Sequence, residues 1–364
     1  MKINSTTNNF QLVRLPIDNA KIIYHDLRPT SFIAIDPIDK KFESVEGCVP
    51  TFQIQHLKEA ITTLKVTYKG PKFEKIKYAE NILLNAISYG NELENIFVQF
   101  SQGSNSSILN AIVLQRKLYT ELADKVHTMQ PGESFIFPGG YTTKNGGGHT
   151  VYYSISKDIT LTYSFEIINS GEGISYHEIL LNKVYTLIYN NISEDKLSIE
   201  FWKKLIAFCT GEYDNINSPE FQKNMDSIYE YLDRHFGNEN KSNGTLHHLQ
   251  DAGICSGKAL SIWFHQFIAY NPGEKLRRSQ EGELVYKQTR LGMLNRSKEY
   301  LEDREIQDVL NGQRFVIHSV PYYRRNVRNN ITFIRGKLDK KISKIKTKIN
   351  HLSRNSYYRY TSRH

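Results

Sequence analysis

Four side chains along the sequence are of the types that carry out acyl transfer through a thiol. Cys255 follows a segment of small residues and precedes apolar residues with helical spacing, so the sequence predicts that it opens a helix. At a helix start, unpaired N–H groups and the helix dipole stabilise a thiolate. Gln250, five residues earlier, supplies an amide that can reach toward an oxyanion. His149 follows three glycines at the start of a β-like run, and its imidazole supplies a base.

The fourth side chain, Asn169, is expected beside His149. Residues 150–156 and 161–168 predict the two strands of a hairpin. In an antiparallel pair the start of one strand lies next to the end of the other, so the Asn169 amide can accept a hydrogen bond from the imidazole and fix its tautomer. Glu172 is the rival orienting residue. Weaker candidates for the base are three further histidines: His177, His247 and His248.

Each of these residues also has an ordinary structural interpretation. A lone cysteine is usually a buried packing residue. His149 could be a surface histidine in a loop, and Asn169 could simply belong to an Asn-Ser-Gly turn. Catalysis is favoured because nucleophile, base, orienting residue and oxyanion donor all occur in one chain.

The order of these residues resembles that of the adenain-like (clan CE) cysteine peptidases. These include SUMO and ubiquitin-like proteases and bacterial effector deubiquitinases and acetyltransferases. The matching segments, within roughly residues 130 to 270, are His149-Thr150, Asn169-Ser170 and Gln250…Ile254-Cys255-Ser256. Asn in place of that group's Asp is similar to papain-like enzymes, and the chain also resembles cysteine-protease-like effectors of intracellular bacteria. The resemblance implies that Cys255 attacks and His149 is the base. It further implies that Asn169 orients His149 and that Gln250 helps to bind the oxyanion.

Hydrophobic periodicity predicts an α+β fold with three regions. Residues 1–129 are expected to form a mixed, mostly helical N-terminal region, and residues 273–364 a helical, basic C-terminal extension. For residues 130–272 the resemblance implies a cysteine-peptidase-like core with a central antiparallel sheet and a nucleophile helix. The strands expected in the core are 134–137, 150–156, 161–168 and 183–189. Helices are expected at about 193–209, 219–236 and 255–270, with a polar loop at 237–244.

The positive charge of the chain is concentrated at its C-terminal end. Residues 320–364 contain 13 Lys and Arg and one Asp, a net charge of +12, so the rest of the chain carries 9 − 12 = −3. Apolar residues at helical spacing in 331–349 predict a basic amphipathic helix. This tail would suit an anionic membrane, nucleic acid or an acidic partner. A solvated helix without a ligand is the alternative.

The cysteines and the hydropathy of the N-terminal residues indicate which cellular compartment and which cofactors to expect. The three cysteines, Cys48, Cys209 and Cys255, cannot form a full set of disulfides and fit no zinc motif, which favours a reducing compartment. Neither a cofactor nor a metal is expected. No apolar signal segment is visible at the N-terminus. We therefore expect a cytoplasmic protein, or one secreted into a host cell without a cleaved signal peptide.

The expected function is a thiol-dependent hydrolase that cleaves peptide or isopeptide bonds in a protein substrate, such as a host or ubiquitin-like protein. An acyltransferase built on the same residues is one alternative. The other is a non-catalytic basic module that binds an anionic surface or nucleic acid.

Overall fold

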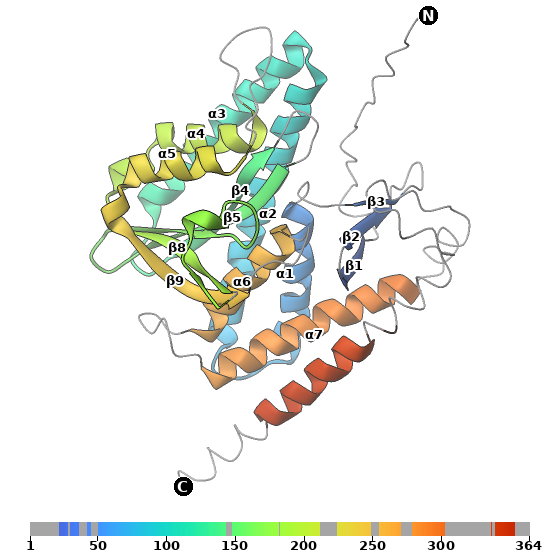
Figure 1. Ribbon diagram of the computed structural model, residues 1–364. Coiled ribbons are helices and arrows are strands. Elements are labelled where there is room, and N and C mark those ends of the chain that lie inside the picture. The colour runs from blue at the N-terminus through green and yellow to red at the C-terminus, as the bar shows by residue number, and fades with distance from the viewer. Residues whose placement is uncertain are drawn as a thin grey trace, which may run out of the picture.

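The computed structural model describes residues 22–27, 30–35, 42–44, 50–142, 148–181, 183–211, 224–248, 255–270, 279–302, 336 and 339–353. Its fold is α+β, as the sequence predicts, with an open antiparallel sheet that carries helices on both faces (Figure 1). Within the described part of the chain, every helix is too short or too polar to cross a lipid bilayer.

Seven long helices carry labels in the described residues. They are α1 (Pro50–Thr67), α2 (Phe73–Gln102), α3 (Asn105–Thr128), α4 (Ile199–Thr210), α5 (Asp226–Phe236), α6 (Cys255–Ala269) and α7 (Gln280–Glu302). Local signals set some of their ends. Gly103 ends α2 with a left-handed φ of 67°, and the Ser104 hydroxyl then caps α3 by accepting from the Ser107 N–H.

The strands form two sheets. The small one contains β1 (Ile22–Leu27), β2 (Thr30–Ile35) and β3 (Phe42–Ser44). The main sheet contains β4 (Ser134–Thr142), β5 (Gly148–Lys157), β6 (Tyr163–Ile168), β7 (Ile179–Leu180), β8 (Lys183–Ile192) and β9 (Lys241–His248). The main sheet has the order β4-β5-β6-β8-β7, and β9 pairs with β8.

The predicted hairpin is confirmed, whereas one predicted loop is partly wrong. β5 and β6 pair through Lys157 and Tyr163, and Asp158 closes the turn by accepting from the Thr160 and Thr162 N–H groups. Residues 237–244 were expected as a loop, but β9 begins at Lys241 and pairs along β8. The ladder to β8 satisfies the backbone of this polar segment, which its own composition does not favour as a strand.

The two faces of the main sheet have separate cores. Val151, Tyr153 and Ile155 of β5 pack with side chains from α3, α4 and α5, on what we call the α5 face. Tyr152 points to the opposite side and packs with α1, α2, α6 and α7, on the α6 face. Each core holds one buried tryptophan, Trp202 on the α5 face and Trp263 on the α6 face.

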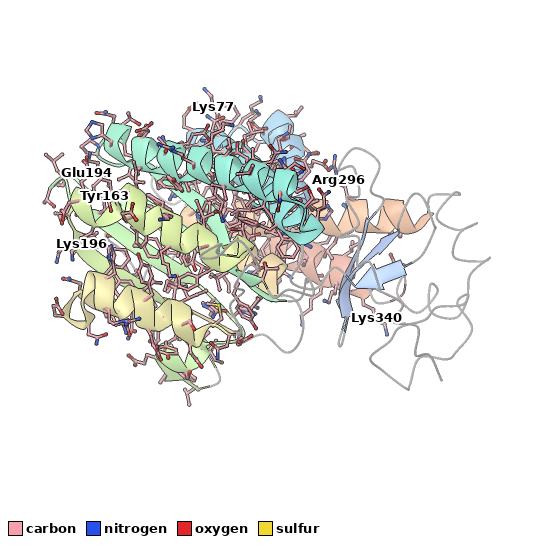
Figure 2. All side chains as sticks on the ribbon, turned by 90° about the horizontal axis from the view of Figure 1, so that it is seen from above. Lys77, Tyr163, Glu194, Lys196, Arg296 and Lys340 are labelled. Atoms are coloured by element: carbon pink, nitrogen blue, oxygen red, sulfur yellow. The ribbon has the colours of Figure 1, made fainter. Side chains whose placement is uncertain are left out.

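Helix α6 lies between the sheet and the pair α1 and α7. Near its C-terminal end the Phe267 ring lies 5.9 Å from that of Tyr78, whose hydroxyl bonds to both backbone groups of Ser134. Ser134 begins β4 and pairs near the end of β5. The same end of the sheet holds Tyr163, which pairs with Lys157 and is labelled in Figure 2 beside Glu194. The N-terminus of α6 therefore points toward the opposite end of the sheet, where β5 begins.

The C-terminal region packs against the body through its helix. Residues 339–353 are helical and lie along α7 (Figure 1). Lys298 Nζ lies 2.7 Å from Asp339 Oδ1, and Ile342 and Ile345 are buried. The part of the predicted apolar stripe that the structure describes therefore faces the protein, and residues 331–335 and 337–338 of the predicted helix lie outside the described residues. Both cores also combine residues from before and after position 130, so that boundary does not separate independently packed units.

Candidate active site

His149 and Asn169 form a buried hydrogen bond. His149 is the second residue of β5 and Asn169 directly follows β6, and the register pairs Tyr152 with Ile168. His149 Nε2 lies 2.9 Å from Asn169 Oδ1, and the two residues are 7% and 0% exposed. The contact predicted from the hairpin is therefore present in the fold.

Two backbone groups fix the orientation of the Asn169 amide. Its Oδ1 accepts from the Gly171 N–H at 3.0 Å, and its Nδ2 donates to the Glu172 carbonyl oxygen at 2.5 Å. A carbonyl oxygen can only accept and an N–H can only donate, so the amide cannot be reversed. His149 Nε2 must then be the donor to Oδ1. In the neutral ring, Nδ1 is left as the basic nitrogen.

The Glu172 carboxylate has other partners. Its Oε2 accepts from the Tyr141 hydroxyl at 2.7 Å, and its Oε1 accepts from the Met225 N–H at 3.2 Å. It thereby ties β4 to the start of α5. The rival orienting role considered for Glu172 is filled by Asn169, while Glu172 contributes its backbone carbonyl.

Two further side chains extend the pair, and sequence reasoning missed one of them. The Tyr229 hydroxyl lies 3.0 Å from Asn169 Nδ2 and 2.6 Å from His177 Nε2. His177 Nδ1 lies 2.7 Å from the Tyr185 carbonyl oxygen. Burial is the main cause that lowers the His177 pKa to about 4. Nothing in the apolar pattern of α5 distinguishes Tyr229 from a packing residue.

His247 is the imidazole that faces α6. It pairs with Val184 at the end of the sheet where α6 begins, on the same side as Thr186, which contacts Gln266 of α6. Burial, and next the nearby Lys258, lowers its pKa to about 4. Its Nε2 is buried and has no hydrogen-bond partner among the described residues. The sequence offered it only as a weak candidate.

The backbone of Cys255 is where the sequence predicts it, as the first residue of α6. Its side chain lies outside the described residues, and so does Gln250. The start of α6 and His149 lie at the same end of the sheet. Strand alternation nevertheless puts the His149 ring on the α5 face, whereas α6 packs on the other. A thiol on α6 can reach this ring only around the end of the sheet.

Cys209 has the surroundings of a structural thiol. It lies on α4, and its Sγ contacts the Gly140 carbonyl oxygen at 3.4 Å and the Leu205 carbonyl oxygen at 3.6 Å. Burial raises the pKa of this thiol to about 12. At neutral pH it is protonated and a poor nucleophile, in line with the inert role expected for it.

A glycine holds β4 close to His149. Gly140 has a φ of +112°, and a Cβ added there would lie 1.9 Å from the His149 carbonyl oxygen. Glycine alone fits both the conformation and the space. This close approach sets the position of the β5 backbone relative to β4 at the residue that carries the imidazole.

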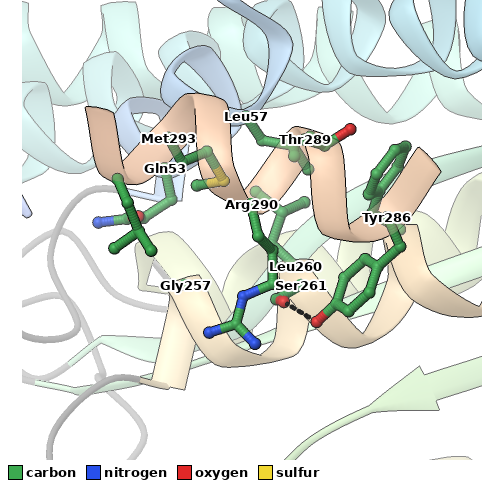
Figure 3. A pocket seen from close by; sticks show the side chains of 11 residues that line it. Gln53, Leu57, Gly257, Leu260, Ser261, Tyr286, Thr289, Arg290 and Met293 are labelled. Carbon is green, nitrogen blue, oxygen red and sulfur yellow. Dashed lines mark hydrogen bonds between the residues drawn. The ribbon is translucent and has the colours of Figure 1, made fainter. Parts of the chain in front are cut away.

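A hollow between α1, α6 and α7 lies one turn into α6 (Figure 3). Arg290 and Tyr286 of α7 line it, and the Tyr286 hydroxyl lies 2.9 Å from Ser261 Oγ of α6. Its volume is about 20 Å³, room for little more than a water molecule. It is too small to be the substrate site in this form.

Comparison with known proteins gives no relative for this chain. No model of a protein family matches it, and no curated protein or solved structure matches it significantly. Among the described residues, His, Cys, Asp and Glu side chains form no group of three placed to hold a metal ion.

Proposed function

We propose that the chain is a thiol-dependent hydrolase of the cysteine peptidase kind, acting on peptide or isopeptide bonds of a protein substrate. The observation that supports it best is the buried His149–Asn169 hydrogen bond, which leaves Nδ1 of the imidazole as the proton acceptor. The start of α6 at Cys255, at the same end of the sheet, adds a thiol in a position that favours the thiolate.

The proposed reaction has two halves. In the first, His149 Nδ1 takes the Cys255 proton, and the thiolate attacks the substrate carbonyl carbon to give a tetrahedral oxyanion. Collapse of this intermediate breaks the C–N bond, and the imidazolium gives its proton to the leaving amine. In the second half, His149 takes a proton from water while the hydroxide attacks the thioester. The C–S bond then breaks, and the sulfur recovers its proton from the imidazolium.

The oxyanion in this proposal is bound by the Cys255 N–H and the Gln250 amide. Asn169 holds the imidazole plane and stabilises the positive charge that His149 gains when it takes a proton. The basic C-terminal helix provides a separate attachment surface for an anionic partner. Its exposed lysines lie away from the buried Ile342 and Ile345, so attachment would use charge rather than insertion of the apolar stripe.

The experiment that tests this proposal is the pH dependence of Cys255 alkylation by iodoacetamide, followed by peptide mass spectrometry. We expect Cys255 to react much faster than Cys209 near neutral pH. His149→Gln should slow the reaction at least tenfold near neutral pH and move its midpoint toward that of an ordinary thiol.

His247→Gln is the matched control, because His247 is a half-buried imidazole at this end of the sheet but faces α6. It should leave the profile unchanged. If His247→Gln slows alkylation and His149→Gln does not, His247 is the base and the proposed assignment is wrong. If neither has an effect and Cys255 reacts like Cys209, the chain is not a thiol enzyme of this kind.

A further inference from the structure

We infer that Tyr229 and His177 are positioning residues for His149, joined to it in a hydrogen-bond chain that runs in one direction. This inference rests on the proposed function, because it assigns a task to the base of that reaction. The chain joins His149, Asn169, Tyr229, His177 and the Tyr185 carbonyl oxygen, with separations of 2.9, 3.0, 2.6 and 2.7 Å.

The direction of each bond follows from groups whose chemistry allows one role. The Tyr185 carbonyl oxygen only accepts, so His177 Nδ1 carries a proton. Burial keeps His177 neutral at pH 7, so its Nε2 accepts, and the Tyr229 hydroxyl donates to it. The Tyr229 oxygen is then the acceptor for Asn169 Nδ2. The backbone contacts of Asn169 require this same amide orientation.

In each of these four hydrogen bonds the donor is therefore the group nearer to His149 along the series. The Asn169 amide uses both protons and both oxygen lone pairs, for the Glu172 carbonyl, Tyr229, the Gly171 N–H and His149. Hydrogen bonds aligned in this way polarise one another, and each acceptor becomes stronger because it also donates. This series of hydrogen bonds thus makes Asn169 Oδ1 a stronger acceptor for the His149 Nε2 proton and stabilises a positive charge on the His149 ring.

Burial keeps water away from these hydrogen bonds. Asn169 and Tyr229 are 0% exposed and His177 is 6% exposed. The Tyr176 ring covers Tyr229 with a centroid distance of 4.6 Å and an interplanar angle of 7°. Solvent cannot replace a lost partner without opening the core, so each member matters more than a surface hydrogen bond would.

The test combines a spectroscopic readout with the alkylation assay. Long-range ¹H–¹⁵N correlation spectra of the full chain should show His177 with its proton on Nδ1 and His149 with its proton on Nε2. Tyr229→Phe deletes one hydroxyl, and we expect it to perturb the resonances of both rings. It should also slow Cys255 alkylation about fivefold, which corresponds to about 1 kcal/mol, the net contribution of one buried hydrogen bond.

Two variants separate positioning from packing. Tyr176→Phe removes the hydroxyl of the ring stacked on Tyr229 and should change neither readout, because that hydroxyl is not in the chain of hydrogen bonds. His177→Gln keeps an acceptor for the Tyr229 hydroxyl and should retain most of the alkylation rate, whereas His177→Leu should lower it as Tyr229→Phe does.

The outcomes are distinct for the inference and for the proposed function. A proton on Nε2 of His177, or equal results for Tyr229→Phe and Tyr176→Phe in both readouts, would overturn the inference. If the spectra respond to Tyr229→Phe but alkylation responds neither to it nor to His149→Gln, the hydrogen-bond chain stands and the proposed enzyme does not.

Discussion

Replacement of Asn169 by alanine should be among the most costly single changes on the α5 face. The side chain is fully buried and makes four hydrogen bonds, to His149, Gly171, Glu172 and Tyr229. At about 1 kcal/mol net for each, the loss is about 4 kcal/mol, and buried partners left unpaired keep it from being smaller. That is a large share of the ~5–15 kcal/mol that stabilises a typical folded protein.

The assay is urea unfolding followed by tryptophan fluorescence. The chain has two tryptophans, and each core holds one of them. A Trp263→Phe background leaves Trp202 as the reporter for the face that carries Asn169. The measured quantity is the change in unfolding free energy between this background and the same background with Asn169→Ala.

Asn190→Ala is the matched control. Asn190 on β8 is half-buried and, among the described residues, its side chain bonds only to the Ser164 and Ser242 hydroxyls, at 3.2 and 2.6 Å, where water can replace it. Its loss should be about 1 kcal/mol or less. If Asn169→Ala destabilises the protein no more than Asn190→Ala does, the buried network around His149 does not exist as described.

Three more predictions concern pH, backbone space and surface charge. The pKa of His177 lies near 4 in the folded protein against 6.5 ordinarily, so the unfolded state binds more protons between these values. The contribution of His177 to stability should be complete above pH 6.5 and fall by about 3 kcal/mol toward pH 4. His177→Gln should remove this part of the slope in urea titrations at each pH, whereas His56 and His247, whose pKa values burial also lowers to about 4, should keep theirs. Gly140→Ala should lower the thermal midpoint far more than Gly103→Ala. Both positions have positive φ, but only at Gly140 would a Cβ meet the backbone of His149, and similar midpoints would contradict this. The C-terminal helix carries exposed lysines at Lys340, Lys344 and Lys348, and replacing them by glutamine should weaken retention on heparin and reduce the salt dependence of that retention. Cys255 alkylation should not slow. Unchanged retention would show that this helix is not the anion-binding site.

The parts of the fold that could be predicted from the sequence depend on local signals. The hairpin of β5 and β6 is marked by β-branched and aromatic runs around an Asp-containing turn, and its register alone brings Asn169 to His149. The start of α6 at Cys255 follows from the small residues before it and the apolar spacing after it. In both cases the information lies within about twenty residues.

What the sequence could not show depends on distant partners. β9 has a polar, glycine-containing sequence, and it is a strand because β8 offers it a ladder. Tyr229 has the spacing of a packing residue on α5, and only the tertiary fold puts its hydroxyl between Asn169 and His177. The face on which His149 lies was also hidden. β5 is buried on both sides, so its hydropathy does not alternate.

The enclosure of α6 has a consequence for synthesis on the ribosome. Its sheet-distant side is covered by α1 and α7, and the Tyr68 hydroxyl, just after α1, bonds to Glu281 of α7 across 213 residues of sequence. α2 can pack against α1 early, but the part of α1 that meets α6 and α7 stays uncovered until α7, which ends at Glu302, has been translated. Nascent chains that lack α7 expose apolar surface, and they fold slowly because contacts between segments distant in sequence form late. We expect nascent chains that end before α7 to depend on chaperones and to aggregate when released early.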